Sequence, residues 1–362
     1  MTKPTSSQPI ISGIGAINTR KSLSETLFFI RGLAIFSVVV GHVIGDRTAG
    51  IRQLYLPDLW QLRDLHDFIY SFHIPIFFIL SGAAFILFSS STSSFFSFAK
   101  NRANRLLIPL LCWAPLHSLL WYFEAGRPLS WRESLTAIFS PNLIFWFWQL
   151  FLVSIVSYLA LRILPTSIYF ALSILLFGLS FWLKGSLADF FYFNWFYVSG
   201  ILIGLRINHR TTLPLVRFSP LWLLAAAGLI FVGMVAIYFY TPVSYPNITR
   251  AINGAIGFLG MYCIAIFSHL ITAHRSRNRL YNLLVSIRRF ILHLGKLSMT
   301  IYVMHVFFST AARVVLMERN ITEPSIQLAF GILIATLGPL AVDALLRPRS
   351  RLYLYTIGEA SN

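Results

Sequence analysis

The chain has 362 residues, of which 57% are hydrophobic and only 11% are charged, whereas a soluble domain carries about 25% charged residues. So little charge cannot cover the surface of a soluble fold of this size, and lipid is the solvent that tolerates such a composition. The net charge of +17 also occurs in nucleic-acid-binding proteins, but here Lys and Arg form short clusters between apolar runs, as in the cytoplasmic loops of membrane proteins. The composition therefore predicts an integral membrane protein and argues against a nucleic-acid partner.

Apolar runs of about 20 residues recur along the chain, each long enough to cross the hydrocarbon core as a helix. The expected fold is an all-α, polytopic integral membrane helical bundle, with a transmembrane domain at 27–346 between tails at 1–26 and 347–362. The expected transmembrane helices, about ten in number, lie at 27–45, 68–88, 106–124, 142–161, 166–183, 190–206, 219–240, 250–272, 291–316 and 325–346.

Lys and Arg are distributed unevenly between the loops on the two sides of these spans. If the N-terminus is cytoplasmic, the inner segments hold roughly twice as many as the outer ones, as the positive-inside rule requires. We therefore expect both termini to be cytoplasmic. The expected location is the inner or plasma membrane of a cell, most typically a bacterial one, with membrane lipid as the immediate partner.

The first span carries two polar residues on one face. Arg31 and His42 are eleven residues apart, which is about three helical turns and roughly 16 Å along the axis. Charged groups at membrane depth are costly and mark functional sites. Asp46, four residues beyond His42, is placed to orient the imidazole ring. The alternative is that Arg31 reaches the inner headgroups and His42 hydrogen-bonds a neighbouring helix.

Two further histidines are expected at a similar depth. His73 opens the second span, and His305 lies in the outer half of the ninth span, with Tyr302 on the same side. A layer of His42, His73 and His305 follows from this arrangement, although a lone core histidine is an equal alternative for His73. Three histidines could bind a metal ion, but their spacing is no local metal motif, so no metal site is expected.

Basic and aromatic residues mark two more candidate positions. Arg102 and Arg105 precede a Leu-Leu-Ile-Pro segment on the expected inner side, where Arg suits phosphate contacts; a topological role is the alternative. Trp146 lies near the outer start of the fourth span, where it either lines a sugar site or belongs to an interfacial belt. The sequence holds no P-loop, Gly-x-Ser-x-Gly elbow or His-Glu-x-x-His motif, so nucleotide hydrolysis is not expected to power the protein.

These motifs together resemble membrane acyltransferase family 3. The segment from Arg31-Gly32 to Gly41-His42 resembles its Arg…Gly-His signature, and Phe72-His73-Ile74-Pro75 is similar to its second-span motif. Weaker similarities follow in order at Arg102 and Arg105, at Trp146-Phe147, and from Gly295-Lys296 to Tyr302 and His305. The Phe-His-Ile-Pro form looks most like the branch that contains fucose O-acetylases and other sugar O-acyltransferases.

The resemblance implies transfer of an acyl group from cytosolic acyl-CoA to a glycan or lipid-linked glycan across the membrane. Acetyl-CoA is the expected donor substrate, with no permanently bound cofactor. Arg31, Arg102 and Arg105 would hold the CoA phosphates, and His42 would be the general base; an acyl-histidine intermediate remains open. His73, Trp146, Tyr302 and His305 would bind the acceptor or stabilise the developing oxyanion.

A transporter of a glycolipid or small solute is the alternative from another class. Many spans, a positive-inside pattern and intramembrane polar residues fit it as well. Transporters often contain two similar halves with interrupted helices. The chain shows no clear internal repeat, and its polar residues concentrate in the first two spans, which favours the enzyme.

Overall fold

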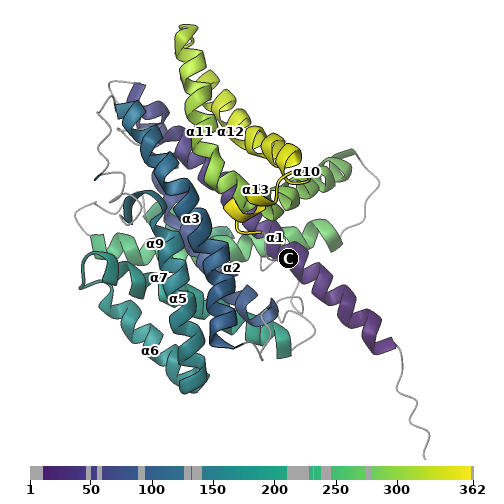
Figure 1. Ribbon diagram of the computed structural model, residues 1–362. Coiled ribbons are helices and arrows are strands. Elements are labelled where there is room, and N and C mark those ends of the chain that lie inside the picture. Colours follow the sequence, from purple (N-terminus) through teal and green to yellow (C-terminus); the bar gives the residue numbers. More distant parts are fainter. Residues whose placement is uncertain are drawn as a thin grey trace, which may run out of the picture.

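The computed structural model describes residues 11–45, 50–54, 59–88, 94–125, 132, 141–209, 228–230, 232–237, 246–273 and 279–359. Within these ranges the regular secondary structure is helical throughout, as expected (Figure 1). The helices are α1 (Ile11–Ile44), the 3-10 helix η1 (Ile51–Leu54), α2 (Trp60–Phe88), α3 (Phe95–Ala125), α5 (Pro141–Ile163), α6 (Thr166–Leu179), α7 (Ser186–His209), α9 (Pro246–Ala273), α10 (Arg279–Lys296), α11 (Ser298–Glu318), α12 (Pro324–Leu346) and α13 (Arg351–Thr356).

Six helices in the described part of the chain are long and apolar enough to cross a membrane. They are Leu23–Ile44, Trp60–Phe88, Trp146–Ile163, Ser186–Ile207, Ser298–Glu318 and Pro324–Leu346. The apolar helix Thr166–Leu179 and the segment Ala251–Ile264 are shorter. The chain is therefore a multi-pass membrane protein, while the count of ten spans and the side of the termini stay predictions. Most of the expected span 219–240 lies outside the described residues.

The expected span 291–316 is divided in the structure. α10 ends at Lys296, and α11 begins at Ser298 after a turn at Leu297. The cause lies in α10, which exposes Arg289, His293 and Lys296 along one side. A helix with a charged side favours the boundary between lipid and water over the hydrocarbon core, so the apolar run is interrupted where α10 ends.

Glycine residues set the closest helix crossings. A Cβ atom on Gly82 of α2 would lie 2.0 Å from the carbonyl oxygen of Tyr197 in α7, and one on Gly200 of α7 would lie 2.0 Å from that of Ile79. The two backbones touch at these positions, as small residues allow in membrane bundles. α1 and α10 cross in the same way. The glycines at the two crossings are Gly82, Gly200, Gly32 and Gly295.

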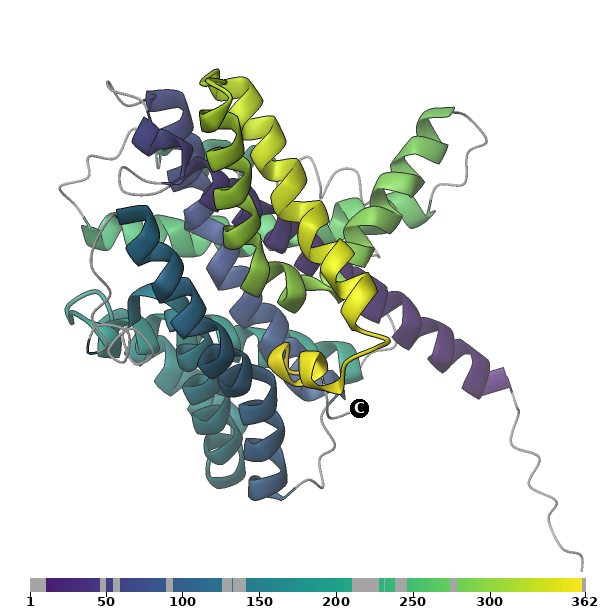
Figure 2. The same cartoon turned by 45° about the horizontal axis from the view of Figure 1, so that its top comes forward.

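The helix that carries Arg31 and His42 runs through the middle of the bundle. α1 contacts α2, α9, α10, α11 and α12. Both views show α11 and α12 side by side along one part of α1, with α3, α5, α6 and α7 gathered on another side (Figures 1 and 2). Residues of α1 therefore meet partners from both ends of the sequence, which brings the candidate site together.

Candidate active site

His42 lies near the end of α1, where α2 and α11 converge on it. The Oη of Tyr70 in α2 is 3.4 Å from His42 Nε2, and the His305 ring in α11 packs edge-on against His42 with a centroid distance of 4.9 Å. His73 and His66 of α2 are also close enough to act electrostatically on His42. Two of the three histidines of the predicted layer, His42 and His305, are thus in direct contact.

Backbone contacts fix the neutral tautomers of two of these histidines. His305 Nδ1 lies 3.0 Å from the carbonyl oxygen of Ile301 and 2.7 Å from that of Tyr302, and His73 Nδ1 lies 2.8 Å from that of Ile69. A carbonyl oxygen only accepts hydrogen bonds, so Nδ1 carries a proton in each ring, and in the neutral imidazole Nε2 then keeps a lone pair. His305 Nε2 is buried without a hydrogen-bond partner. Beside His42 there is therefore a nitrogen able to accept a proton or a hydrogen bond.

Aromatic rings extend the cluster on either side. Trp146 packs edge-on against Tyr302 at 4.6 Å, and the Tyr302 and His305 rings are 5.9 Å apart. On the α2 side, Tyr70 packs edge-on against His73 at 4.8 Å. The four residues that were predicted to bind the acceptor all lie within this one cluster around His42.

Tyr70 and His66 of α2 are members of the cluster that the sequence analysis missed. The two rings stack at 4.2 Å, and His66 Nδ1 is 3.0 Å from Asp67 Oδ1. Their spacing held a usable signal, because residues 66, 70 and 73 follow the i, i+4, i+7 pattern of one helix face. Asp46, the expected orienting carboxylate, lies outside the described residues.

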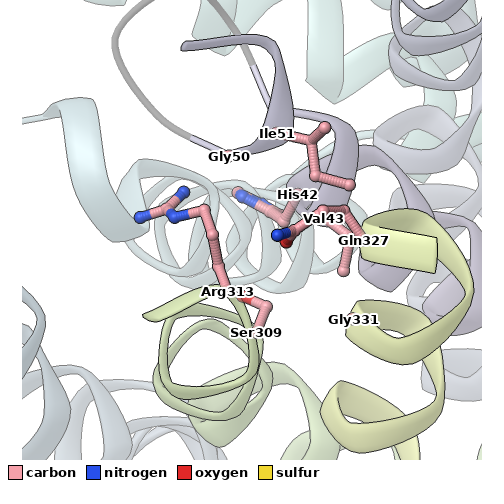
Figure 3. A pocket seen from close by; sticks show the side chains of 8 residues that line it. All are labelled: His42, Val43, Gly50, Ile51, Ser309, Arg313, Gln327 and Gly331. Atoms are coloured by element: carbon pink, nitrogen blue, oxygen red, sulfur yellow. The ribbon is translucent and has the colours of Figure 1, made fainter. Parts of the chain in front are cut away.

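A small pocket opens beside His42. His42 and Val43 of α1 line it together with Gly50 and Ile51, and α11 and α12 close it with Ser309, Arg313, Gln327 and Gly331 (Figure 3). Its volume of about 10 Å³ is roughly that of one water molecule. The pocket therefore has room for one small polar group next to the His42 ring. Within the residues that the structure describes, no group of three or more His, Cys, Asp or Glu side chains could hold a metal ion.

At the other end of the candidate site, two of the three predicted phosphate-binding arginines act on each other electrostatically. The charged groups that act on Arg31 are Glu359, which attracts it, and Arg105 of α3, which repels it. Arg102 lies one turn before Arg105, with its guanidinium 5.3 Å from the Phe98 ring. Arg31 of α1 and Arg105 of α3 are thus within electrostatic range of each other, and two neighbouring cations favour an anionic partner.

A buried carboxylate of α12 anchors the C-terminal segment beside these arginines. Asp343 accepts hydrogen bonds from Thr300 at 3.1 Å, from Tyr353 at 2.7 Å, and from Arg347 at 2.8 and 3.0 Å. The hydrogen bonds to Asp343 raise the pKa of Arg347 above its ordinary value. Arg347 also pairs with Glu359. The network thus holds Glu359 within electrostatic range of Arg31. The sequence analysis passed over Asp343, which is a lone carboxylate in an apolar run.

The sequence matches a known protein family. A family model described as an acyltransferase domain matches residues 27–343. The match contains the His42 cluster and both Arg31 and Arg105. No curated protein and no solved structure matches the chain. The likeness to the fucose O-acetylase branch therefore stays a prediction. The matched range covers most of the chain, however, and shows that the protein belongs to membrane acyltransferase family 3.

Proposed function

We propose that the protein is a membrane O-acyltransferase that moves an acyl group, most simply acetyl, from acyl-CoA on the cytoplasmic side to a hydroxyl of a glycan or lipid-linked glycan on the opposite side. The observation that carries the proposal is the layout of α1. One end of this helix carries Arg31, within electrostatic range of Arg105, and the other carries His42 beside a pocket. The proposed anion site and the proposed base would thus be held roughly 16 Å apart on one rigid element.

In the proposed reaction the arginines bind the donor. Arg31 and Arg105, with Arg102 one turn away, contact the CoA phosphates, because guanidinium groups suit phosphate oxygens. The thin pantetheine arm follows α1 toward His42 and brings the thioester to the histidine cluster. Holding the donor and the acceptor in one place removes much of the entropic barrier to their reaction.

His42 would act as the general base. The acceptor hydroxyl attacks the thioester carbonyl carbon while its proton passes to His42, and the C–S bond of the tetrahedral intermediate then breaks. The departing thiolate takes the proton from His42, so the products are the O-acyl ester and free CoA. His305 Nε2, which carries a lone pair beside His42, would orient the His42 ring. Tyr70 and Tyr302 supply hydroxyl groups near the developing oxyanion.

Membrane vesicles of defined orientation test the proposal. Acyl-CoA does not cross a bilayer, so labelled acetyl-CoA reaches only the face that is exposed to the medium. We expect labelled glycan in inverted vesicles, whose cytoplasmic face is outward, and none in right-side-out vesicles. Labelling of right-side-out vesicles alone would refute the proposed donor side, and glycan export without any use of acyl-CoA would favour a transporter instead.

A further inference from the structure

The pocket beside His42 has a second wall that the proposed reaction does not use. Its polar members are Ser309 and Arg313 of α11 and Gln327 of α12. His305, Ser309 and Arg313 are spaced four residues apart, which places them along one face of α11. In Figure 3 the side chains of His42, Arg313 and Gln327 extend from three helices toward the same space.

Gln327 leaves one hydrogen-bonding atom unsatisfied at this pocket. The residue is 1% exposed, and its Nε2 donates to the carbonyl oxygen of Ile321 at 2.7 Å. That contact fixes the orientation of the amide, because the carbonyl of Ile321 needs a donor. Gln327 Oε1 is therefore the atom left over, and it is buried without a hydrogen-bond partner. Buried polar atoms are rarely left unpaired, so a donor group of a ligand fits here.

Arg313 adds donors to the same wall. It is 9% exposed, and a guanidinium carries five N–H groups, so it can bind a ligand oxygen while it keeps its protein contacts. Gly331, one turn after Gln327, keeps this wall close to α1, since a Cβ atom there would lie 2.8 Å from Val43 Cγ1. The wall thus offers an acceptor atom and several donors, which is what a sugar hydroxyl requires.

We propose that Gln327 and Arg313 form a subsite for a second hydroxyl of the acceptor, on the carbon next to the one whose hydroxyl His42 deprotonates. A pocket of about 10 Å³ has room for one hydroxyl group only, so the second hydroxyl occupies the pocket and the reacting hydroxyl lies at its edge beside His42, on the neighbouring carbon. The acceptor is accordingly a sugar with two neighbouring free hydroxyls. The O–H of the second hydroxyl donates to Gln327 Oε1, and its oxygen accepts from Arg313. This inference rests on the proposed acyl transfer and adds the substrate class of its acceptor site.

The test measures transfer of label from acetyl-CoA to host membrane glycans, with and without periodate treatment of the glycans. Periodate cleaves the bond between carbons that carry neighbouring free hydroxyls, and borohydride alone serves as the control treatment. We expect periodate to abolish labelling by the wild-type protein. Labelling that survives complete periodate oxidation overturns the proposal.

Kinetic measurements on substituted proteins give a second test of the subsite. Gln327→Leu should raise the acceptor KM roughly three- to tenfold with little change in kcat, because one hydrogen bond to the acceptor is lost. Gln149→Leu is the matched control, since Gln149 is also buried, donates to a backbone carbonyl and has an unpartnered Oε1, but lies outside the pocket. If Gln327→Leu does not fold, Arg313→Lys takes its place, and the control is Arg319→Lys, since Arg319 is exposed and follows directly after the same helix.

The outcomes separate the two proposals. Equal acceptor KM values for Gln327→Leu and Gln149→Leu, or for Arg313→Lys and Arg319→Lys where that pair is used, overturn the subsite and leave the acyl transfer standing. Absence of any label from acetyl-CoA with the wild-type protein, at verified insertion, refutes the proposed function and the subsite with it.

Discussion

Replacing Gly82 with alanine tests the packing that holds α2 against α7. The new Cβ atom would lie 2.0 Å from the carbonyl oxygen of Tyr197, whereas ordinary contacts begin at 3.4 Å, so the helices must separate by about 1.4 Å. Overpacking costs about 1–3 kcal/mol, and the upper end applies because a backbone carbonyl cannot rotate away. Alanine recovers about 1 kcal/mol through helix propensity, which leaves a net loss of about 2 kcal/mol in the free energy of unfolding.

Gly178→Ala in α6 is the matched control for this prediction. No atom lies within 4 Å of the Cβ position there, so only the propensity gain of about 0.5–1 kcal/mol remains. The assay is a titration with SDS that unfolds the detergent-solubilised protein, and tryptophan fluorescence monitors the unfolding. The Gly82→Ala and Gly200→Ala changes should cost less together than the sum of the single changes, because the first already separates the helices. Equal stabilities of Gly82→Ala and Gly178→Ala would refute the reasoning.

Three further predictions follow from the site. Asp343→Asn should speed tryptic cleavage at Arg351 by roughly 30-fold or more, because charge-assisted hydrogen bonds worth about 1.5–3 kcal/mol each anchor the C-terminal segment; an unchanged cleavage rate contradicts this. Glu359→Gln should lower the KM for acyl-CoA about two- to fivefold, since a partly exposed carboxylate that competes for Arg31 is worth about 0.5–1 kcal/mol; a raised KM counts against it. His305→Gln should lower kcat by up to ~100-fold, at the lower end of what general-base catalysis contributes, with the acceptor KM nearly constant.

Much of the helical layout could be predicted from the sequence, because lipid restricts spanning segments to apolar helices. The expected spans 142–161 and 325–346 lie within α5 and α12, whose observed bounds are Pro141–Ile163 and Pro324–Leu346. The division at Leu297 was not predicted, since the apolar residues continue across it. The apolar run is interrupted by the charged side of α10. A scan of hydropathy along the chain does not reveal this side, because its charged residues are separated by apolar ones and come together only around the helix.

The candidate site was predictable in part for a similar reason. Strict helical spacing aligned Arg31 with His42, and expected depth alone grouped His42, His73 and His305. Contacts between helices do not follow from spacing, so the sequence could not show that Gln327 of α12 closes the pocket beside His42. Its neutral side chain also gives no signal of membrane depth, unlike a charge.

The most direct test of the central claim compares wild type with His42→Ala for transfer of label from acetyl-CoA to membrane glycans, at matched amounts of inserted protein. His293→Ala is the control, because His293 is exposed on α10, away from the cluster. We expect His42→Ala to lose at least ~100-fold in rate, as loss of a general base predicts, while His293→Ala keeps wild-type activity. Normal transfer by His42→Ala would contradict the assignment of His42 as the catalytic base.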